Sequence, residues 1–344
     1  MTICKRFSVV VGCLLSSAFG AAGLRAQDHV VYTGGAGAGE GQHLVFLTGD
    51  EEYRSEEGLV QLAKILAFRH GFKSTVLFAI DPKDGKINPN VNNALPSAEL
   101  LDSADALIMG LRFRNYPDDV MQHFVDAYLA GKPIVAVRTS THAFYYPADS
   151  NSRFAHYAHD SKKWTGGFGR QVLGETWVTH LGSNHKQATL GVPVAEVKDH
   201  PLLRGVGKIF AQTGSYTADP MPDSTILVHG LVLSGMTPDS PPVTGEKYDP
   251  PQPVAWSRVH QSESGHTNRV LCTTMGAATD LLDQSLRRLL VNGVYWGLKK
   301  EVPQRADVRL VGDYKPTEYS FNGFRKGVKP ADLMITRAEA LRDE

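Results

Sequence analysis

Cysteine is scarce in this chain, and so are long apolar runs and net charge. Only three of the 344 residues are cysteines, and Cys4 and Cys13 lie within the first 26 residues. If that start is removed, Cys272 stands alone and no disulfide can form within the chain. Cys272 ends the apolar run 269–272, which indicates a buried small hydrophobe rather than a reactive thiol.

The chain has no net charge, which argues against partners that carry many negative charges. The 36 basic and 36 acidic side chains cancel. A protein that binds nucleic acid needs a basic face to displace counterions from phosphates, so we expect no nucleic-acid partner. The balance also gives no reason to expect adhesion to an anionic membrane.

The first 26 residues differ in composition from the rest. Lys5 and Arg6 precede a mostly apolar stretch at 7–15, and small residues follow through Gly23. This apolar run is far shorter than the roughly 20 residues that a spanning helix needs. Residues 1–26 therefore predict a secretory signal peptide, an exported protein in the periplasm or outside the cell, and no membrane span.

Three segments follow the predicted signal peptide. Residues 27–42 are rich in glycine and read as a flexible leader; they lack the Gly-Lys-Ser/Thr ending of a phosphate loop. Residues 43–300 are predicted to form one α/β domain. Residues 301–344 are polar and irregular, which predicts a C-terminal tail that wraps over the surface or is partly disordered.

Within the domain, apolar strands alternate with amphipathic helices. Strands are predicted at 43–48, 74–79, 104–110 and 133–137, and helices at 55–70 and 117–130. Beyond a looser stretch at 145–265, a strand at 268–274 and a helix at 280–298 follow. This rhythm predicts a mostly parallel sheet with helices on both faces. Such sheets bind ligands beyond the carboxyl ends of their strands, which directs attention to loops 49–54, 111–116 and 138–144.

The sharpest of these loops runs from Arg138 to His142. A buried strand breaks there into a guanidinium, three hydroxyls and an imidazole. Ser140 with His142 as its base would resemble a hydrolase nucleophile, but residues two apart rarely meet in that geometry. The favoured interpretation makes Arg138 and His142 groups that bind substrate oxygens or transfer protons. The alternative is a turn that merely ends a strand, with its hydroxyls bonded to the backbone.

Two other polar clusters accompany this turn. Acids in the loop at 50–54 could join the site, or could be charges stabilised at a helix N-terminus. Arg112 and Arg114 would bind an anion or a buried carboxylate. His180 and His185 could form a three-histidine metal site with His142, so a divalent metal is one cofactor to test, although the 13 histidines of the chain make chance pairs expected.

Together these segments resemble the ThuA-like (trehalose-utilisation) family. The similar stretches are 45–54, 138–144, 166–177, 200–204 and 273–277. The resemblance implies a flavodoxin-like fold of the class I glutamine amidotransferase kind. The position of the amidotransferase cysteine falls on Arg138, so glutamine hydrolysis is not expected.

The resemblance also implies carbohydrate metabolism, with acid/base lyase or hydrolase chemistry on glycosides or 3-keto-glycosides. His142, Glu51 or Asp50 would be the base. The residues expected to bind substrate are Arg54, Tyr53, Arg112, Arg114, Arg138, Thr139, Thr141, Phe144, Trp177, His180 and His185.

Two alternatives remain open. One is a non-catalytic sugar-binding module, which a carboxylate-free aromatic site around His142 would favour. The other is a serine hydrolase acting through Ser140, which fluorophosphonate probes would label. Convergence of Asp50 or Glu51 with His142 would favour the lyase or hydrolase.

Overall fold

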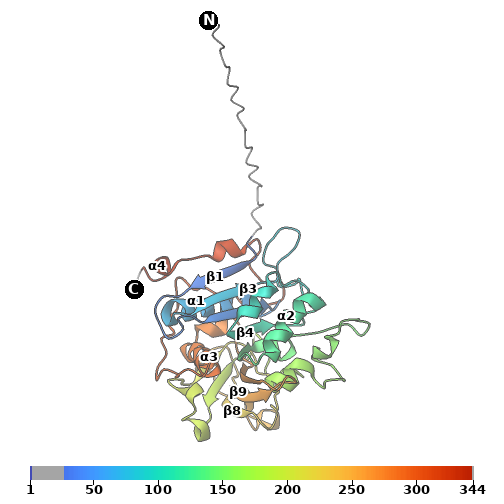
Figure 1. Cartoon of the computed structure of the whole chain (residues 1–344). Coiled ribbons are helices and arrows are strands. Elements are labelled where there is room, and N and C mark those ends of the chain that lie inside the picture. Colours follow the sequence, from blue (N-terminus) through green and yellow to red (C-terminus); the bar gives the residue numbers. More distant parts are fainter. Residues whose placement is uncertain (2–26, 343–344) are drawn as a thin grey trace.

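The structure, a computed structural model, describes Met1 and residues 27–342 (Figure 1). Apart from Met1, the predicted signal peptide lies outside the described residues. No helix in the described part of the chain is long and apolar enough to cross a membrane.

Ten strands form one mixed sheet in the described residues, in the order β1-β3-β2-β4-β5-β10-β9-β8-β6-β7. The strands are β1 (His29–Thr33), β2 (His43–Gly49), β3 (Lys73–Leu77), β4 (Ala106–Leu111), β5 (Ile134–Val137), β6 (Thr189–Pro193), β7 (Ile209–Ala211), β8 (Thr225–Val232), β9 (Gln252–Gln261) and β10 (Thr267–Thr273). In Figure 1 the sheet extends from β1 at the top to β8 and β9 at the bottom.

The helices are α1 (Ser55–His70), α2 (Asp118–Leu129), α3 (Gln284–Gly297) and the short α4 (Arg337–Ala340). Single helical turns complete the secondary structure: η1 (Ala98–Ser103), η2 (Arg138–His142), η3 (Ala155–Tyr157), η4 (Gly169–Leu173), η5 (Ala195–Val197), η6 (Pro201–Leu203), η7 (Glu246–Tyr248), η8 (Thr279–Leu282) and η9 (Pro330–Leu333).

The predicted parallel sheet is only half of the observed one. Strands β3, β2, β4, β5 and β10 are parallel neighbours, whereas β1 and the run β10-β9-β8-β6-β7 pair antiparallel. The expectation of a mostly parallel sheet was therefore wrong for the whole sheet. A parallel return needs a crossover, usually a helix. Residues 145–266, all of them described, contain no α-helix, so the strands there return through turns and loops and pair antiparallel.

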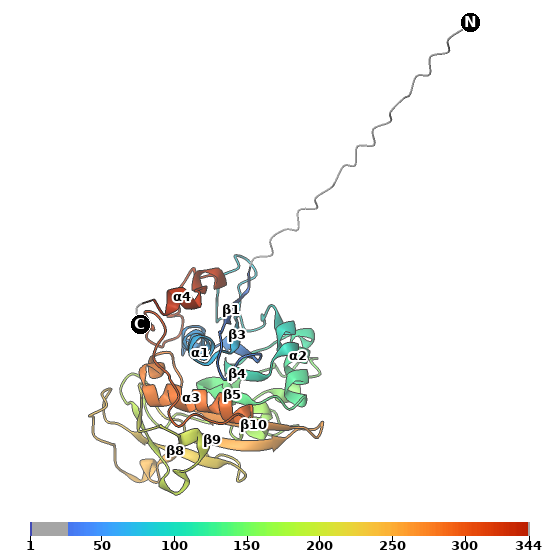
Figure 2. The same cartoon turned by 60° about the vertical axis from the view of Figure 1, so that its left-hand side comes forward.

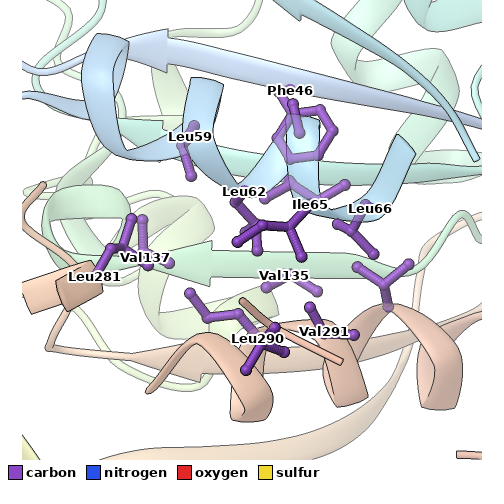
Figure 3. Close-up of a cluster of buried hydrophobic side chains, with 14 of the residues drawn as sticks. Phe46, Leu59, Leu62, Ile65, Leu66, Val135, Val137, Leu281, Leu290 and Val291 are labelled. Carbon is purple, nitrogen blue, oxygen red and sulfur yellow. The ribbon is translucent and has the colours of Figure 1, made fainter. Parts of the chain in front are cut away.

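Helices cover both faces of the parallel half, as predicted. Figure 2 shows α1 and α2 on opposite sides of β3, β4 and β5. In Figure 3, Leu62 and Ile65 of α1 and Leu290 of α3 meet around Val135 of β5. On the other face, Phe124 of α2 packs in a second apolar cluster with the opposite side of the same strands. Each side chain of this size contributes roughly 1.5–3 kcal/mol when fully buried, so the two clusters hold the helices against the two faces of the sheet.

The observed α1 has the predicted bounds, because its end signals are strong. Gly71 adopts φ 85° after the last turn, and its N–H reaches the carbonyls of Ala67 and Leu66. Only glycine takes this left-handed conformation at little cost. The acidic Glu56 and Glu57 occupy the first turn, where the helix dipole favours negative charge.

The segment predicted as a flexible leader is partly ordered in the sheet. His29–Thr33 form β1, which pairs antiparallel with β3. The glycines that follow allow close packing: a Cβ at Gly39 would lie 2.3 Å from the ring of Phe72. The glycine run therefore allows the chain to pass close to the end of α1.

The C-terminal tail wraps over the surface. It crosses the outer side of α1, where Thr317 donates from its backbone to Glu57 at 2.8 Å. Further along, Ser320 accepts a hydrogen bond from Arg54, and the ring of Tyr319 is 1% exposed. The tail thus reaches the loop that follows β2, at the carboxyl end of the parallel strands.

Candidate functional site

Arg138 begins the turn η2 after β5 and is the central cation of this edge of the sheet. Its φ is 47°, a left-handed conformation that costs a non-glycine residue about 1–2 kcal/mol. Its guanidinium donates to the carbonyls of Gly214 at 2.8 Å and Thr274 at 2.7 Å. It is also flanked by the rings of Tyr53 at 4.3 Å and Tyr216 at 4.1 Å. These contacts hold the strained turn and keep the buried charge solvated by the protein.

The Tyr53 hydroxyl contacts three other side chains of the site. It accepts hydrogen bonds from Arg138 Nη2 at 3.0 Å and Asn184 Nδ2 at 2.8 Å, and it lies 3.4 Å from Nε2 of His180. Burial raises the pKa of Tyr53, and Arg138 opposes this shift. With two donors already directed at its oxygen, the phenol's own proton is free to point toward His180.

His180 suits the role of acceptor for that proton. Desolvation by the surrounding rings, followed by repulsion from Arg138 and Arg112, lowers the pKa of His180 to about 4. The imidazole is therefore neutral near pH 7 and has one nitrogen lone pair. Since the residue is also exposed, Tyr53 and His180 form a pair through which a proton can pass between the buried phenol and the surface.

Glu52 is a site residue that the sequence analysis did not select. Its side chain is 9% exposed and lies 3.4 Å from Asn184 Nδ2. Among the described residues, no basic group forms an ion pair with it. Burial, then the charge of Asp50, raises the pKa of Glu52. A buried carboxyl group with a raised pKa suits proton transfer. The only sequence signal for Glu52 was its position in the acidic loop 50–52.

Asp50 and Glu51, which were predicted as catalytic bases, are bound to other groups. Asp50 is 1% exposed and accepts the backbone N–H groups of Glu52 and Tyr53 and the hydroxyl of Thr139. Glu51 pairs with Arg112 and, at 2.9 Å, with the buried Arg114. The two acids therefore shape the loop after β2 and tie it to the turns after β4 and β5.

His142 is enclosed by rings. It is 3% exposed, with ring centroids 4.9 Å from Phe113 and 5.3 Å from Trp177. Burial, then the charge of Arg112, lowers the pKa of His142 well below its ordinary value. Its Nδ1 lies 3.2 Å from the hydroxyl of Thr141. His142 is a neutral hydrogen-bonding group in an aromatic wall, and no carboxylate contacts it in the described part of the chain.

The three histidines of the expected metal site do not converge. Trp177 contacts His142 at 5.3 Å and His180 at 5.8 Å. His185 stacks instead on Tyr319, with centroids 4.3 Å apart. In residues 27–342, no three histidine, cysteine or acidic side chains are placed to hold a metal ion.

Tyr319 brings the tail into the site. Its ring stacks on Tyr53 at 5.4 Å as well as on His185, and its hydroxyl donates to the carbonyl of Gln212 at 3.1 Å. No pattern in the sequence linked residue 319 to the loop after β2, because their contact depends on the path of the tail.

Other predicted residues lie outside this cluster. Phe144 packs in the core against Phe124, with centroids 5.0 Å apart. Arg54 is fully buried and donates to the tail at Ser320. Ser140 is also fully buried, and its hydroxyl donates to the carbonyl of Met109 at 2.9 Å, which leaves no accessible nucleophile.

Comparison with known proteins finds solved structures of low sequence identity. No protein-family model and no curated protein match the chain. A Bacteroides uniformis protein named as ThuA-like aligns with 76% of this chain and 92% of its own, at 15% identity and a TM-score of 0.46. A Parabacteroides merdae protein of the same name aligns with 82% of this chain and 97% of its own, at 14% identity and a TM-score of 0.49.

Proposed function

We propose that this chain is a ThuA-like, carbohydrate-active protein that processes glycosides or 3-keto-glycosides by acid/base chemistry centred on Tyr53. The observation that carries the proposal is the Tyr53 hydroxyl, which is held by Arg138 and Asn184 and is aimed at His180. Glu52 beside it supplies a carboxyl group with a raised pKa.

The sheet topology supports the location. The parallel strands run in the order β3-β2-β4-β5-β10, which in chain order is the two-one-three-four-five arrangement of flavodoxin-like sheets. The strand order of such a sheet reverses between β2 and β4, and ligands bind in the crevice beyond the carboxyl ends there. Glu51 after β2 is paired with Arg112 after β4 at this point. We therefore propose a flavodoxin-like core, with an antiparallel extension.

The chemistry follows from the available groups. In a 3-keto-glycoside, the C2–H bond is acidified by the neighbouring carbonyl. Glu52, as the carboxylate, takes the C2 proton; the C1–O bond to the aglycone breaks, a C1–C2 double bond forms, and the departing oxygen takes a proton from Tyr53. His180 restores the phenol proton from solvent, and Glu52 returns its proton to solvent. General acid and base groups of this kind contribute about 100-fold to 10,000-fold each.

The sugar would lie against the aromatic wall. The indole Nε1 of Trp177 is buried without a hydrogen-bond partner in the described residues. An unsatisfied buried donor costs about 1–3 kcal/mol. A ligand hydroxyl that accepts a hydrogen bond from this N–H would therefore be favoured. His142 and Phe113 line the same wall and would position the ring rather than react with it.

The experiment is a screen of the purified protein against oxidised and unoxidised glycosides, with and without chelator. Release of the aglycone is the quantity measured. We expect release from the oxidised series, and a loss of at least about 100-fold in kcat for Tyr53→Phe and Glu52→Gln. Full activity in both variants would refute the assignment.

A second candidate, a sugar-binding module without chemistry, is supported by the carboxylate-free surroundings of His142. It predicts binding of intact glycosides with no release by the wild type and weaker binding by Trp177→Ala.

The predicted signal peptide supports export to the periplasm or beyond the cell. N-terminal sequencing of the protein recovered from a periplasmic or culture-medium fraction tests it, with cleavage expected near residue 26.

A further inference from the structure

A cavity separate from the Tyr53 site lies between α1 and the C-terminal tail. Its volume is about 470 Å³, which falls within the range of small-molecule sites. Glu56, Val60 and Lys64 of α1 line one side, and Ile87, Tyr314 and Val328 line the other. No step of the proposed reaction uses any of these residues.

Glu56 is the unexplained group in this cavity. Its side chain is 8% exposed, and neither carboxyl oxygen has a hydrogen-bond partner on another described residue. Buried polar groups almost always have partners, and a buried carboxylate without one is strongly disfavoured. Glu56 therefore needs a donor that the chain itself does not provide.

Most of the other charged side chains around the cavity already have hydrogen-bond or ion-pair partners. Glu57 accepts from Thr317 at 2.8 Å and lies 3.5 Å from Arg325, and Lys315 is paired with Asp313. Lys64 has no carboxylate within ion-pair distance in the described residues; its Nζ lies 5.7 Å from the ring of Tyr32. Asp332, which also lines the cavity, accepts the backbone N–H of Lys329 at 2.8 Å. Among the described lining residues, the ionisable groups with no hydrogen-bond or ion-pair partner on another residue are thus Glu56 and Lys64.

The geometry of α1 separates these two groups. Glu56, Val60 and Lys64 lie at successive turns of one helix face, so the first and last are about 12 Å apart along the axis. An acidic group stands at one end of the cavity, an apolar wall of Val60 and Ile87 lies between, and a cation stands at the other end.

We propose that this cavity binds a small aliphatic monoamine, with its ammonium group on Glu56 and its chain along Val60 and Ile87. The ammonium donates charge-assisted hydrogen bonds to the free carboxyl oxygens, which are stronger than neutral ones. Lys64 repels a second cation and so selects against diamines.

Hexylamine is the probe, and isothermal titration calorimetry of the full chain is the assay. We expect hexylamine to bind, and hexanol, hexanoate and hexamethylenediamine each to bind about tenfold more weakly or worse. Glu56→Gln should weaken hexylamine at least about tenfold, while Lys64→Met should restore the diamine. Glu40→Gln, an exposed carboxylate outside the cavity, is the matched control and should change nothing.

Proton release gives a second readout. Burial raises the pKa of Glu56 to about 8, so at pH 7 the carboxyl is mostly protonated and must ionise when an ammonium binds. The charged groups nearest to it are Arg54, Glu57, Asp50 and, from the tail, Lys326. Titration in two buffers of different ionisation enthalpy should show proton release for the wild type and none for Glu56→Gln.

The outcomes are decisive. No heat with hexylamine, which would indicate a cavity filled by water alone, overturns the proposal. Equal affinity for hexanol, or unchanged hexylamine affinity in Glu56→Gln with its thermal unfolding intact, also overturns it. Glycoside cleavage uses the Tyr53 site, so the result is independent of the proposed enzymatic function.

Discussion

Replacing Glu56 with glutamine should make the protein more stable at alkaline pH. The pKa of this carboxyl is about 8 in the folded chain, against an ordinary value of 4.5. Since the folded value is the higher one, folding favours the protonated group. Its stabilising contribution is complete below pH 4.5 and is lost as pH rises to about 8.

The size of the effect follows from the separation of the two pKa values. At about 1.4 kcal/mol for each pH unit, the wild type loses roughly 3–5 kcal/mol through Glu56 by pH 9. This is a large part of a typical folding free energy of about 5–15 kcal/mol. Glutamine has a similar shape and no charge, so Glu56→Gln avoids this loss.

Urea unfolding, followed by tryptophan fluorescence, measures the difference between the two proteins at pH 5 and pH 9. At pH 5 they should agree within about 1 kcal/mol; at pH 9 the variant should be more stable by about 3–5 kcal/mol. All other titrating groups are shared, so their contributions cancel. A difference that stays the same at both pH values would show that Glu56 is not a buried neutral acid.

Three further changes test the organisation of the Tyr53 site. Arg138→Met removes three hydrogen bonds from a buried cation and should cost about 3 kcal/mol in urea unfolding; a cost below about 1 kcal/mol would contradict its role in holding η2. Glu51→Gln leaves the buried Arg114 with a weaker partner and should cost about 2–4 kcal/mol, yet leave aglycone release per folded molecule near that of the wild type; a loss as large as that of Tyr53→Phe would restore Glu51 as a base. Tyr319→Ala removes the ring stacked on Tyr53 and His185 and should weaken glycoside binding by about tenfold and speed proteolysis of the tail, both visible by calorimetry and limited digestion; no change in either would separate the tail from the site.

Local signals determined much of the parallel half of the fold. Helix α1 has the predicted bounds because Gly71 ends it and apolar side chains recur every three to four residues along it. The apolar runs of β2, β4 and β5 are buried on both faces, which is why they were recognisable. By contrast, β1 follows Gln27 and precedes a glycine-rich stretch, and its pairing with β3 arises from packing rather than from its own pattern.

The sequence also located the edge of the sheet at which the polar residues gather, because parallel strands place their carboxyl ends together. It could not assign roles there. Asp50, Glu51 and Glu52 are three adjacent acids, and their sequence does not show which accepts backbone N–H groups, which pairs with arginine and which lies beside an amide without an ion pair. Only the tertiary structure decided this, because the partners, Thr139, Arg114 and Asn184, come from three other segments. The same reason explains why Tyr319 and the Glu56 cavity were invisible in the sequence: both depend on where the tail crosses α1, and a polar, irregular segment carries no periodic pattern that fixes its path.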